Sequence, residues 1–521
     1  MSNLTFKQAA PGAHARRILT ALALLLAACV GCEATSYERN PDRGSLVTAD
    51  VIRQRTKGTV GNVARRVPDI RPFTQGETWS ALAGAVAGFL RAFETVPLFP
   101  SRIGAEVAPP PDCPPEEVGP DGSCTFNPRA VLLALSDFLE QSLFSDDHLE
   151  ARERNSATFL LRGASFCDGM QPCSGAPGEL CGAPNASCIQ SIDAAQVRVK
   201  ATLVGADGLD VAVLVGPDRA KPVVLELRPT SLAVELDLES GKLALDHLQA
   251  VAGNGEAEVG RARGRLRFQF TSPGPDDISF VSSIPEAVQF QLNVPQGPIE
   301  LAIAARSPAI TLRAQGAQGA LETLSIAVDN GPIDLSVPYA FLTEGKGSGT
   351  LALHLSGQTW RTEAKANQPS LVLTDISWHE PSTLKKDGVA IFALDVNPNS
   401  GRKFELSLTP AETPAGILFR VQPELDVSAD CNLQAIANEF PDIPVPFQST
   451  RYELALQGPG EASVLPIADS KAVAEAGLKV VSGQLSLHAS GHDSLVIPAG
   501  QCIRVVETSP KQFAFELNAC Q

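Results

Sequence analysis

Aromatic residues are scarce in this chain. Only 5% of its 521 residues are Phe, Tyr or Trp, and Phe supplies 22 of them. Met is rarer still, with two residues. We therefore expect a core built from Leu, Val, Ile and Ala, with Phe as its main ring. The hydrophobic fraction of 44% is nonetheless ordinary for a globular protein.

Positive charge is also in short supply. The chain has 42 Lys and Arg against 58 Asp and Glu, a formal net charge of −16. This balance argues against a nucleic-acid partner. Residues 1–71 are basic, in contrast to the rest. A basic segment beside a membrane anchor can lie on an anionic membrane surface, and the alternative is a soluble, flexible spacer, which we favour.

Intact catalytic motifs are missing as well. There is no G-x-S-x-G and no P-loop order of glycines and lysine. His379-Glu380-Pro381 does not continue into HExxH, and Ser382 with Lys385 has no companion KTG. In 491–495 the inserted His492 breaks a resemblance to the GDSL esterase block.

No metal or cofactor motif is complete either. The run from Asp395 to Gly401 spaces oxygen donors as in a calcium loop, but Leu406 stands where a bidentate Glu belongs. We expect a hairpin loop there, no metal site and no cofactor. The absence of intact motifs makes a non-catalytic protein the leading expectation, with no catalytic residue assigned.

Long hydrophobic runs are absent, and the longest candidate is near the start. The apolar run from Ile18 to Val30 follows Arg16 and Arg17 and is shorter than the about 20 residues that a membrane-spanning helix needs. A basic segment, a short apolar run and small residues at its end are typical of an export signal. Leu26-Ala27-Ala28-Cys29 resembles the lipobox of bacterial lipoproteins. The resemblance implies a signal peptide over 1–28, lipidation of the Cys29 thiol and acylation of the new amino terminus.

Cys32 is the alternative lipid site. The residues before it, Cys29-Val30-Gly31, lack the expected leucine. Parity also favours Cys29, because removing one of 11 cysteines leaves an even number for disulfides, whereas lipidation of Cys32 would leave nine in the mature chain. An exported chain meets an oxidising compartment. The candidate disulfide cysteines are Cys113, Cys124, Cys167, Cys173, Cys181, Cys188, Cys431, Cys502 and Cys520.

Four of these cysteines lie in one stretch, residues 167–188, with little apolar periodicity. We expect covalent bridges to hold it, in one of three pairings that sequence does not choose between. Zinc is the alternative, but the short CxxC spacing typical of zinc sites is missing.

Two segments have helical periodicity. Residues 76–96 and 127–144 each repeat apolar residues at three-and-four spacing, and Asn127-Pro128 is a suitable helix start. Both helices would be amphipathic, and we expect them to pack against the body of the protein. Residues 29–71, polar and broken by Pro and Gly, indicate a flexible tether.

From residue 196 to the C-terminus the period changes to two. Apolar and polar residues alternate in segment after segment, for example Leu232 to Leu238, where Ser240-Gly241 is expected to turn the chain into a further strand at Leu243. Strict alternation predicts strands with one buried and one wet face, hence antiparallel sheet. Only 434–440 reads as a helical turn.

A short echo occurs within this β region. Gly297-Pro298-Ile299 returns as Gly331-Pro332-Ile333, each copy after an alternating segment. A repeated structural unit is one interpretation. We favour two separate hairpins, each turning where the echo occurs.

Together these features predict a mainly β protein. Its domains are a signal peptide (1–28), a tether (29–71), a helical and cysteine-rich region (72–195) and an antiparallel β body (196–521), which can hold two subdomains. The sheet would form either a sandwich or an open, curved groove.

The leading functional expectation is a non-catalytic binding or structural module of the cell envelope. Its membrane contact would be through the lipid anchor, on the outer membrane facing the periplasm or the exterior, with other envelope proteins or lipid as partners. The Leu-rich, alternating strand pattern resembles that of envelope proteins that form β-grooves for lipids, so lipid or apolar-ligand binding is the second hypothesis. A hydrolase with an unrecognised site, using His379, His488 or His492, is the third.

Overall fold

The chain folds mainly into antiparallel β-sheet, as the alternation predicted. The structure is a computed structural model and describes residues 46–68, 132–133, 136, 139–160, 197–252, 257–318, 320–342, 347–366, 368, 371–396, 403–411, 416–439, 449–466, 476–509 and 512–519. The helix predicted over 76–96 and the cysteines from Cys29 to Cys188 lie outside these residues. In the described part, none of the helices has the length and apolarity to cross a membrane.

Two compact units make up the described residues, and each is treated by itself. Unit 1 takes residues 46–65, 132–260 and 292–295, and unit 2 takes residues 66–68, 261–291 and 296–519. Within the β body, the boundary between the two units falls near residue 260.

Unit 1 is an antiparallel sheet covered by a helix. Its strands pair in sequence order: β1 (Leu149–Arg152), β2 (Ser156–Leu160), β3 (Arg198–Val204), β4 (Gly208–Val215), β5 (Ala220–Arg228) and β6 (Ser231–Asp237). Helix α2 (Ala49–Arg65) contacts β4, β5 and β6. Its Ile52, Val60 and Val63 are fully buried, and Phe144 packs on Phe159 with ring centroids 5.1 Å apart. Unit 1 thus has a closed core.

The prediction of a flexible tether over 29–71 fails in this unit. Residues 49–65 are helix α2, not tether, because Thr56, Thr59 and the aliphatic residues form one buried stripe that the sheet covers. Of the helix predicted over 127–144, the described residues 132, 133, 136 and 139–143 are helical, the last five as the π-helical turn η2 (Leu139–Leu143). The 3-10 turn η3 (Asp146–His148) follows.

The strand predicted to resume at Leu243 is instead part of helix α7 (Leu238–Ala252). The carboxylate of Asp237 accepts a hydrogen bond from the amide of Ser240 at 2.9 Å, which caps the first turn. Lys242 and Asp246, one turn apart, form an ion pair. Short Leu repeats fit both periods, and here the cap decides for helix.

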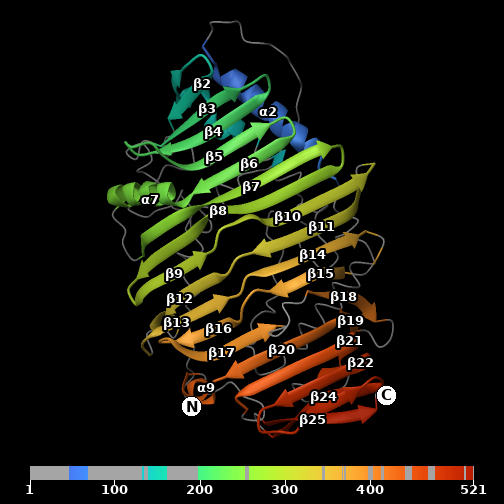
Figure 1. The fold of residues 1–521 in the computed structure, drawn as a ribbon. Helices are drawn as coiled ribbons and strands as arrows, with labels where there is room; N and C mark the ends of the chain where they lie inside the picture. The colour runs from blue at the N-terminus through green and yellow to red at the C-terminus, as the bar shows by residue number, and fades with distance from the viewer. Residues whose placement is uncertain are drawn as a thin grey trace, which may run out of the picture. The chain divides into compact units, whose positions relative to one another are not determined.

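The strands of unit 2 form two series of antiparallel pairs, which lie side by side (Figure 1). Wing 1, drawn on the right, has the pairing order β8–β10–β11–β14–β15–β18–β19. Wing 2, on the left, has the order β9–β12–β13–β16–β17–β20. The strands are β7 (Glu258–Gly274), β8 (Asp277–Val294), β9 (Gly297–Ile303), β10 (Arg306–Ala317), β11 (Ala320–Asn330), β12 (Ile333–Pro338), β13 (Thr350–Leu355), β14 (Gln358–Lys365), β15 (Leu371–Trp378), β16 (Ser382–Lys386), β17 (Val389–Val396), β18 (Phe404–Ala411), β19 (Gly416–Gln422) and β20 (Glu424–Cys431).

At the C-terminal end of unit 2, uninterrupted strands pair with the last strands of both wings. The first half of β21 (Arg451–Pro466) pairs with β20 and its second half with β19, and β22 (Ala476–Ala489) pairs along both halves of β21. β23 (Leu495–Pro498) and β24 (Gln501–Ser509) then pair with the two halves of β22, and β25 (Gln512–Ala519) pairs with β24. Two short helices, α8 (Tyr339–Leu342) and α9 (Leu433–Glu439), lie in the connections.

The two series are one meander of long, interrupted strands. β11 and β12 follow each other in the chain but do not pair, since β11 pairs with β10 and β14, and β12 with β9 and β13. The links at 304–305, 331–332, 356–357 and 379–381 each interrupt a strand in this way. They lie side by side, because the Ala304 amide bonds to the Pro332 carbonyl at 3.2 Å and the His379 amide to the Gly357 carbonyl at 3.1 Å. We call this row of links the break line.

The break line corrects two hairpin predictions. Asn330-Gly331-Pro332 is a link within one long strand, and no hairpin turn is formed there. Gly331 is needed because an added Cβ would meet the Ala304 Cβ at 2.7 Å. The segment from Asp395 to Gly401 likewise connects β17 to β18, which do not pair with each other. The hairpin prediction was wrong in both cases, because a turn and a break within a strand use the same residue types.

Buried side chains gather along the break line at the C-terminal end of unit 2. The cluster consists of Ile376, Phe404, Val421, Leu456, Val480, Leu485 and Ile497, with Trp360, Trp378 and several leucines packed against it. Phe404 and Val421 come from wing 1, and Ile497 pairs with Leu485 beside wing 2. The apolar faces of both wings therefore meet there.

Gly483 should be the least replaceable residue of this cluster's backbone. It has φ +76°, and a Cβ added there would lie 2.3 Å from the Gln457 carbonyl oxygen and 2.9 Å from the Gly460 Cα. We expect Gly483→Ala to lower the free energy of unfolding by about 2–4 kcal/mol, from backbone strain plus the clash. Gly491→Ala is the matched control, since Gly491 has φ +85° with nothing within 4 Å. Equal losses in chemical denaturation would show that backbone conformation alone matters.

Candidate functional site

Unit 2 presents one apolar and one polar face. In wing 2 the register places Leu301, Leu335, Leu353 and Leu384 in one row across β9, β12, β13 and β16. In wing 1 a matching row runs through Phe280, Leu312 and Ile326. Because side chains alternate between faces, the residues between these belong to the other face, among them Glu300, Ser336 and Lys385.

The apolar face is only partly covered over β8–β16. The leucines of the wing 2 row are half-buried, and Ile310 and Leu355 expose 39% and 40% of their surface. At the cluster by the C-terminus, by contrast, Val421, Val480 and Ile497 are fully buried. The same apolar face is therefore closed at one end and open to contact along the rest. Phe280, with Phe270 at 4.8 Å and Phe268 at 6.2 Å, is the ring cluster on the open part.

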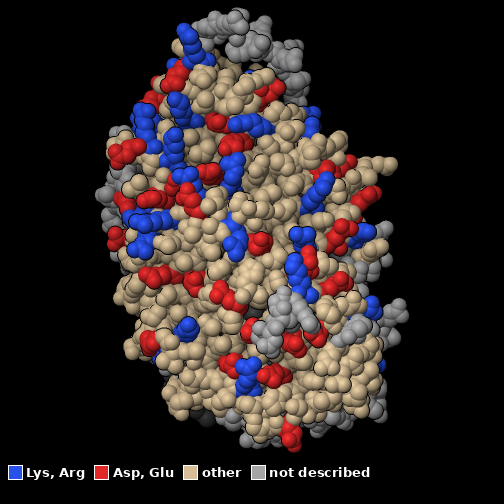
Figure 2. All heavy atoms as spheres, viewed as in Figure 1, with Lys and Arg blue, Asp and Glu red and all other residues tan. Residues whose placement is uncertain are grey.

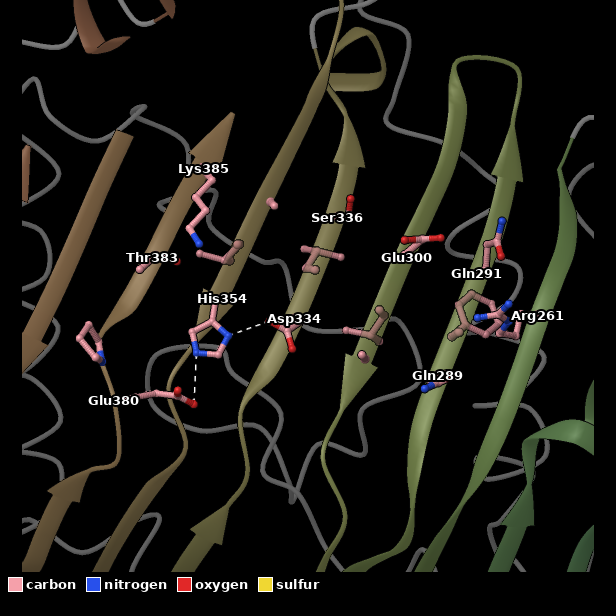
Figure 3. Close-up of a pocket in the computed structure, with 17 residues that line it drawn as sticks. Arg261, Gln289, Gln291, Glu300, Asp334, Ser336, His354, Glu380, Thr383 and Lys385 are labelled. Carbon is pink, nitrogen blue, oxygen red and sulfur yellow. Dashed lines mark hydrogen bonds and ion pairs between the residues drawn. The ribbon is translucent and has the colours of Figure 1, made fainter. Parts of the chain in front are cut away.

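The polar face of wing 2 carries a cavity of about 640 Å³ (Figure 3). Its polar lining comes from strands β7, β8, β9, β12, β13 and β16 and from the link before β16, with Arg261, Gln289, Gln291, Glu300, Asp334, Ser336, His354, Glu380, Thr383 and Lys385. The lining mixes both signs of charge. On the face seen in Figure 2, basic and acidic side chains are likewise interspersed. Mixed charge fits neither a polyanion nor a cation site.

His354 is the centre of this cavity's polar contacts. Its Nδ1 lies 2.7 Å from Asp334 Oδ1, and its Nε2 lies 3.3 Å from Glu380 Oε1. Beside it, the buried hydroxyl of Ser356 accepts hydrogen bonds from the amides of His379 at 3.2 Å and Glu380 at 3.0 Å. The backbone of the break line and the side chain of His354 thus fix the same link.

Sequence reasoning did not single out His354 as functional. His354 lies on the polar face of β13, opposite Asp334. The signal that could have found it is the register, since Asp334 and His354 each stand a few residues from a Gly-containing link. Without knowing that these links align, the sequence gives no reason to bring them together.

Two histidines of the hydrolase hypothesis, His488 and His379, each lie within hydrogen-bond distance of a hydroxyl. His488 Nδ1 lies 3.1 Å from Ser494 Oγ on an exposed turn between β22 and β23. A base that activates a nucleophile needs a third group to orient it. Glu453, which stands opposite His488, is held by Arg451 at 2.7 Å instead. His379 Nε2 contacts Thr359 Oγ1 at 3.2 Å.

Two cysteines, Cys431 and Cys502, lie in the described residues. Cys431 is a free, half-buried thiol, which corrects its assignment as a disulfide candidate. Burial, and then the charge of Asp430, raise the pKa of the Cys431 thiol, so it is not an activated nucleophile. Cys502 lies in β24 opposite Asn518 of β25. Within the described residues, no three His, Cys, Asp or Glu side chains are arranged as a metal site.

Comparisons with protein-family models, with curated proteins and with solved structures find no match to this chain.

Asp426 on β20 is the described carboxylate whose charge is least favourable. Burial, then the charges of Glu424 and Glu453, raise its pKa. A raised folded-state pKa means that the protonated form is favoured, so stability is present at low pH and is lost as pH rises through the folded pKa. We expect Asp426→Asn to raise Tm at pH 8 and to change it little at pH 4.

The matched control is Asp430→Asn on the same strand. Asp430 forms an ion pair with Arg451 at 3.1 Å, so this change should lower Tm slightly at pH 8. A thermal-unfolding series from pH 4 to 8 measures both. If Asp426→Asn lowers Tm at pH 8, its carboxylate is stabilising and the electrostatic argument fails.

Proposed function

We propose that this chain is a lipid-anchored, non-catalytic protein of the cell envelope whose unit 2 binds acyl chains on its apolar face. The observation that carries the proposal is the continuous Leu-rich face over β8–β16, which stays half-exposed while the same face is fully packed at the C-terminal cluster. A contiguous exposed apolar surface of this kind marks a binding site in soluble proteins.

The dimensions favour a chain-like apolar ligand. The row from Leu301 to Leu384 crosses four neighbouring strands, so it extends about 15 Å at about 4.8 Å between strands. One leaflet of a bilayer has a hydrocarbon depth of about 15 Å, half of about 30 Å. A single acyl chain laid across the strands would therefore match the wing 2 row.

The chemistry of the lining favours the same ligand. The row is aliphatic and carries no charge, and one aromatic residue, Phe392 of β17, stands opposite its last member, Leu384. Aliphatic side chains offer non-directional burial, at about 25 cal/mol per Å², and do not demand a ligand of fixed shape. The lipobox resemblance of Leu26-Ala27-Ala28-Cys29 supports the proposal from another side, because it would bring the site to a membrane where such chains are plentiful.

Lipid bound to the mature protein tests this site. We expect organic extraction of protein purified from envelopes, followed by mass spectrometry, to give stoichiometric acyl lipid beyond the covalent anchor. The double variant Leu335→Asn with Leu353→Asn should lower the bound lipid by about five-fold or more, as each change removes roughly 1 kcal/mol of apolar transfer energy. Circular dichroism should show that the variant keeps its sheet.

Ala352→Asn is the matched control. Ala352 precedes Leu353 in β13, and by strand alternation its side chain belongs to the other face, so this variant should keep its lipid. Two results would contradict the proposal. One is absence of bound lipid in the unmodified protein. The other is a loss of stability in the double variant with no change in lipid, which would mean that protein, such as the amphipathic segment 76–96 or a second copy, covers this face.

The anchor is tested separately. We expect Cys29→Ser to abolish acylation and to move the protein from the membrane fraction to the soluble fraction, while Cys32→Ser leaves it membrane-bound. Intact mass spectrometry of each form gives the mass of the attached lipid. Membrane association that depends on Cys32 and not on Cys29 would exchange their roles.

A further inference from the structure

Exposed large apolar side chains gather at one end of wing 2. Phe341 and Leu342 of α8 expose 46% and 53% of their surface, and Val389 at the start of β17 exposes 56%. The other exposed large apolar residues of the described part are spread singly along the chain. Single exposed apolar residues are normal on a protein surface, whereas a group of them indicates a surface that makes contact with something else.

Hydrogen bonds hold the two segments of this group together. The Tyr339 amide donates to the Gly349 carbonyl at 2.8 Å, and the Asp387 amide donates to the Thr350 carbonyl at 2.9 Å. Gly349 and Thr350 are consecutive residues, so α8 and the turn that joins β16 to β17 lie side by side at the start of β13. We call α8 together with residues 385–389 the wing 2 tip.

Two lysines flank the apolar residues of the wing 2 tip. Lys386 lies at the rim of the apolar face, with its Nζ 4.5 Å from the centre of the Tyr339 ring, and Lys385 lies on the polar face. The only acid of the tip is Asp387, whose Oδ1 accepts a hydrogen bond from the Thr350 amide at 2.8 Å. The tip therefore carries two cations against one anion, and that anion is turned toward the backbone.

Apolar side chains with lysines beside them suit the surface of an anionic membrane. Phe, Leu and Val can enter the boundary between headgroups and acyl chains, while a lysine buries its aliphatic stem there and keeps its ammonium among the headgroups. Each cation near such a surface is attracted by the negative charge of the lipids. The composition of the wing 2 tip thus favours lipid as its partner.

The wing 2 tip is continuous with the apolar face. The register places Val337, Leu351 and Lys386 in one row across β12, β13 and β16, and this row is the edge of the apolar face next to the tip. Leu353 of the leucine row follows two residues after Leu351, about 7 Å along the strand. No polar row lies between the tip and the leucines on this face.

We propose that the wing 2 tip contacts a membrane surface that contains anionic lipid. Phe341, Leu342 and Val389 enter the interface, and the two lysines lie at the headgroups. The contact brings the end of the leucine row to the bilayer, so that acyl chains enter the row from the strand ends. This entry route rests on the proposed function, whereas the membrane contact does not.

Vesicle binding by the mature chain without its anchor tests the contact. Residues 29–521, produced without the signal on which acylation depends, keep every described residue. We expect this chain to sediment with vesicles of phosphatidylcholine that contain about one-quarter phosphatidylglycerol. Binding to phosphatidylcholine alone should be about five-fold weaker or more, because each lysine near an anionic surface contributes about that factor.

The double variant Phe341→Ser with Leu342→Ser should lower vesicle binding about ten-fold or more, because it removes two exposed apolar side chains from the interface. Leu46→Ser with Leu243→Ser is the matched control. These two leucines of unit 1 are exposed to about the same extent and lie outside the wing 2 tip, so the control should bind vesicles as the unmodified chain does.

Two single variants serve if the double variant fails to fold. Val389→Ser should weaken binding to both kinds of vesicle, and Lys386→Gln should weaken binding to the anionic vesicles alone. Hydrogen exchange of the unmodified chain gives an independent measurement. Amides in 339–342 and 386–390 should exchange more slowly when anionic vesicles are present.

Several results would overturn the membrane contact. These are an unmodified chain that does not sediment with vesicles, an equal loss of binding in the matched control, and a double variant that binds vesicles normally. A double variant that turns a dimer into a monomer and still binds vesicles would make a second copy of the chain the partner of the tip.

The contact and the proposed function can fail separately. Vesicle binding through the tip, with no acyl lipid extracted from the purified mature protein, would keep the contact and reject the proposed function. Stoichiometric acyl lipid in a protein that does not bind vesicles would keep the function and reject the contact.

Discussion

The structure of unit 2 depends on one constraint: neighbouring long strands are all interrupted at the same level along their length. A backbone group that leaves the ladder must find another partner when it is buried. Here the links supply each other, as the amide of Ala304 bonds to Pro332 and that of His379 to Gly357. A single interruption would leave unpaired groups inside the sheet. Repeated in register, it becomes a continuous seam with its own hydrogen bonds.

This seam explains why the apolar face is closed in one place and open in another. Side chains within reach of the seam, such as Phe404 and Leu456, meet partners from the opposite wing and become buried. Side chains in the middle of a wing have neighbours only within their own layer, and Leu335 and Leu353 remain half-exposed. Unit 1 shows the contrast, because helix α2 supplies a second layer and its Ile52 is fully buried.

The sequence was sufficient to predict the class of fold. The alternation over residues 258–519 is a local property, and the pattern within each strand shows which of its two faces is exposed to solvent. The short helix at 433–439 was also predicted correctly. What the sequence did not contain was the relation between links. Gly331-Pro332 looks the same whether the chain reverses or runs on, and the outcome depends on pairing with β9 and β13, which are distant in the chain.

The same limit applies to the candidate site. The sequence predicts that the leucines of this row lie on one face of a sheet. It does not predict how much of that face stays exposed, because this depends on which other layers pack against it. His354 gained its partners only through register. Helix α7 failed for a different reason, because the Leu spacing after Asp237 suits both periods and a single capping carboxylate tips the balance.

The pairing order has a consequence for how such a sheet can vary. Every long strand of the meander pairs with the strands that directly precede and follow it in the chain. Insertion or loss of one complete hairpin whose strands are interrupted at the break line would therefore leave all other strand pairings intact. The width of the apolar face across the strands is then set by the number of hairpins that the sequence encodes, much as the length of a solenoid is set by its number of repeats. Proteins of this construction could be matched to ligands of different length by whole-hairpin steps.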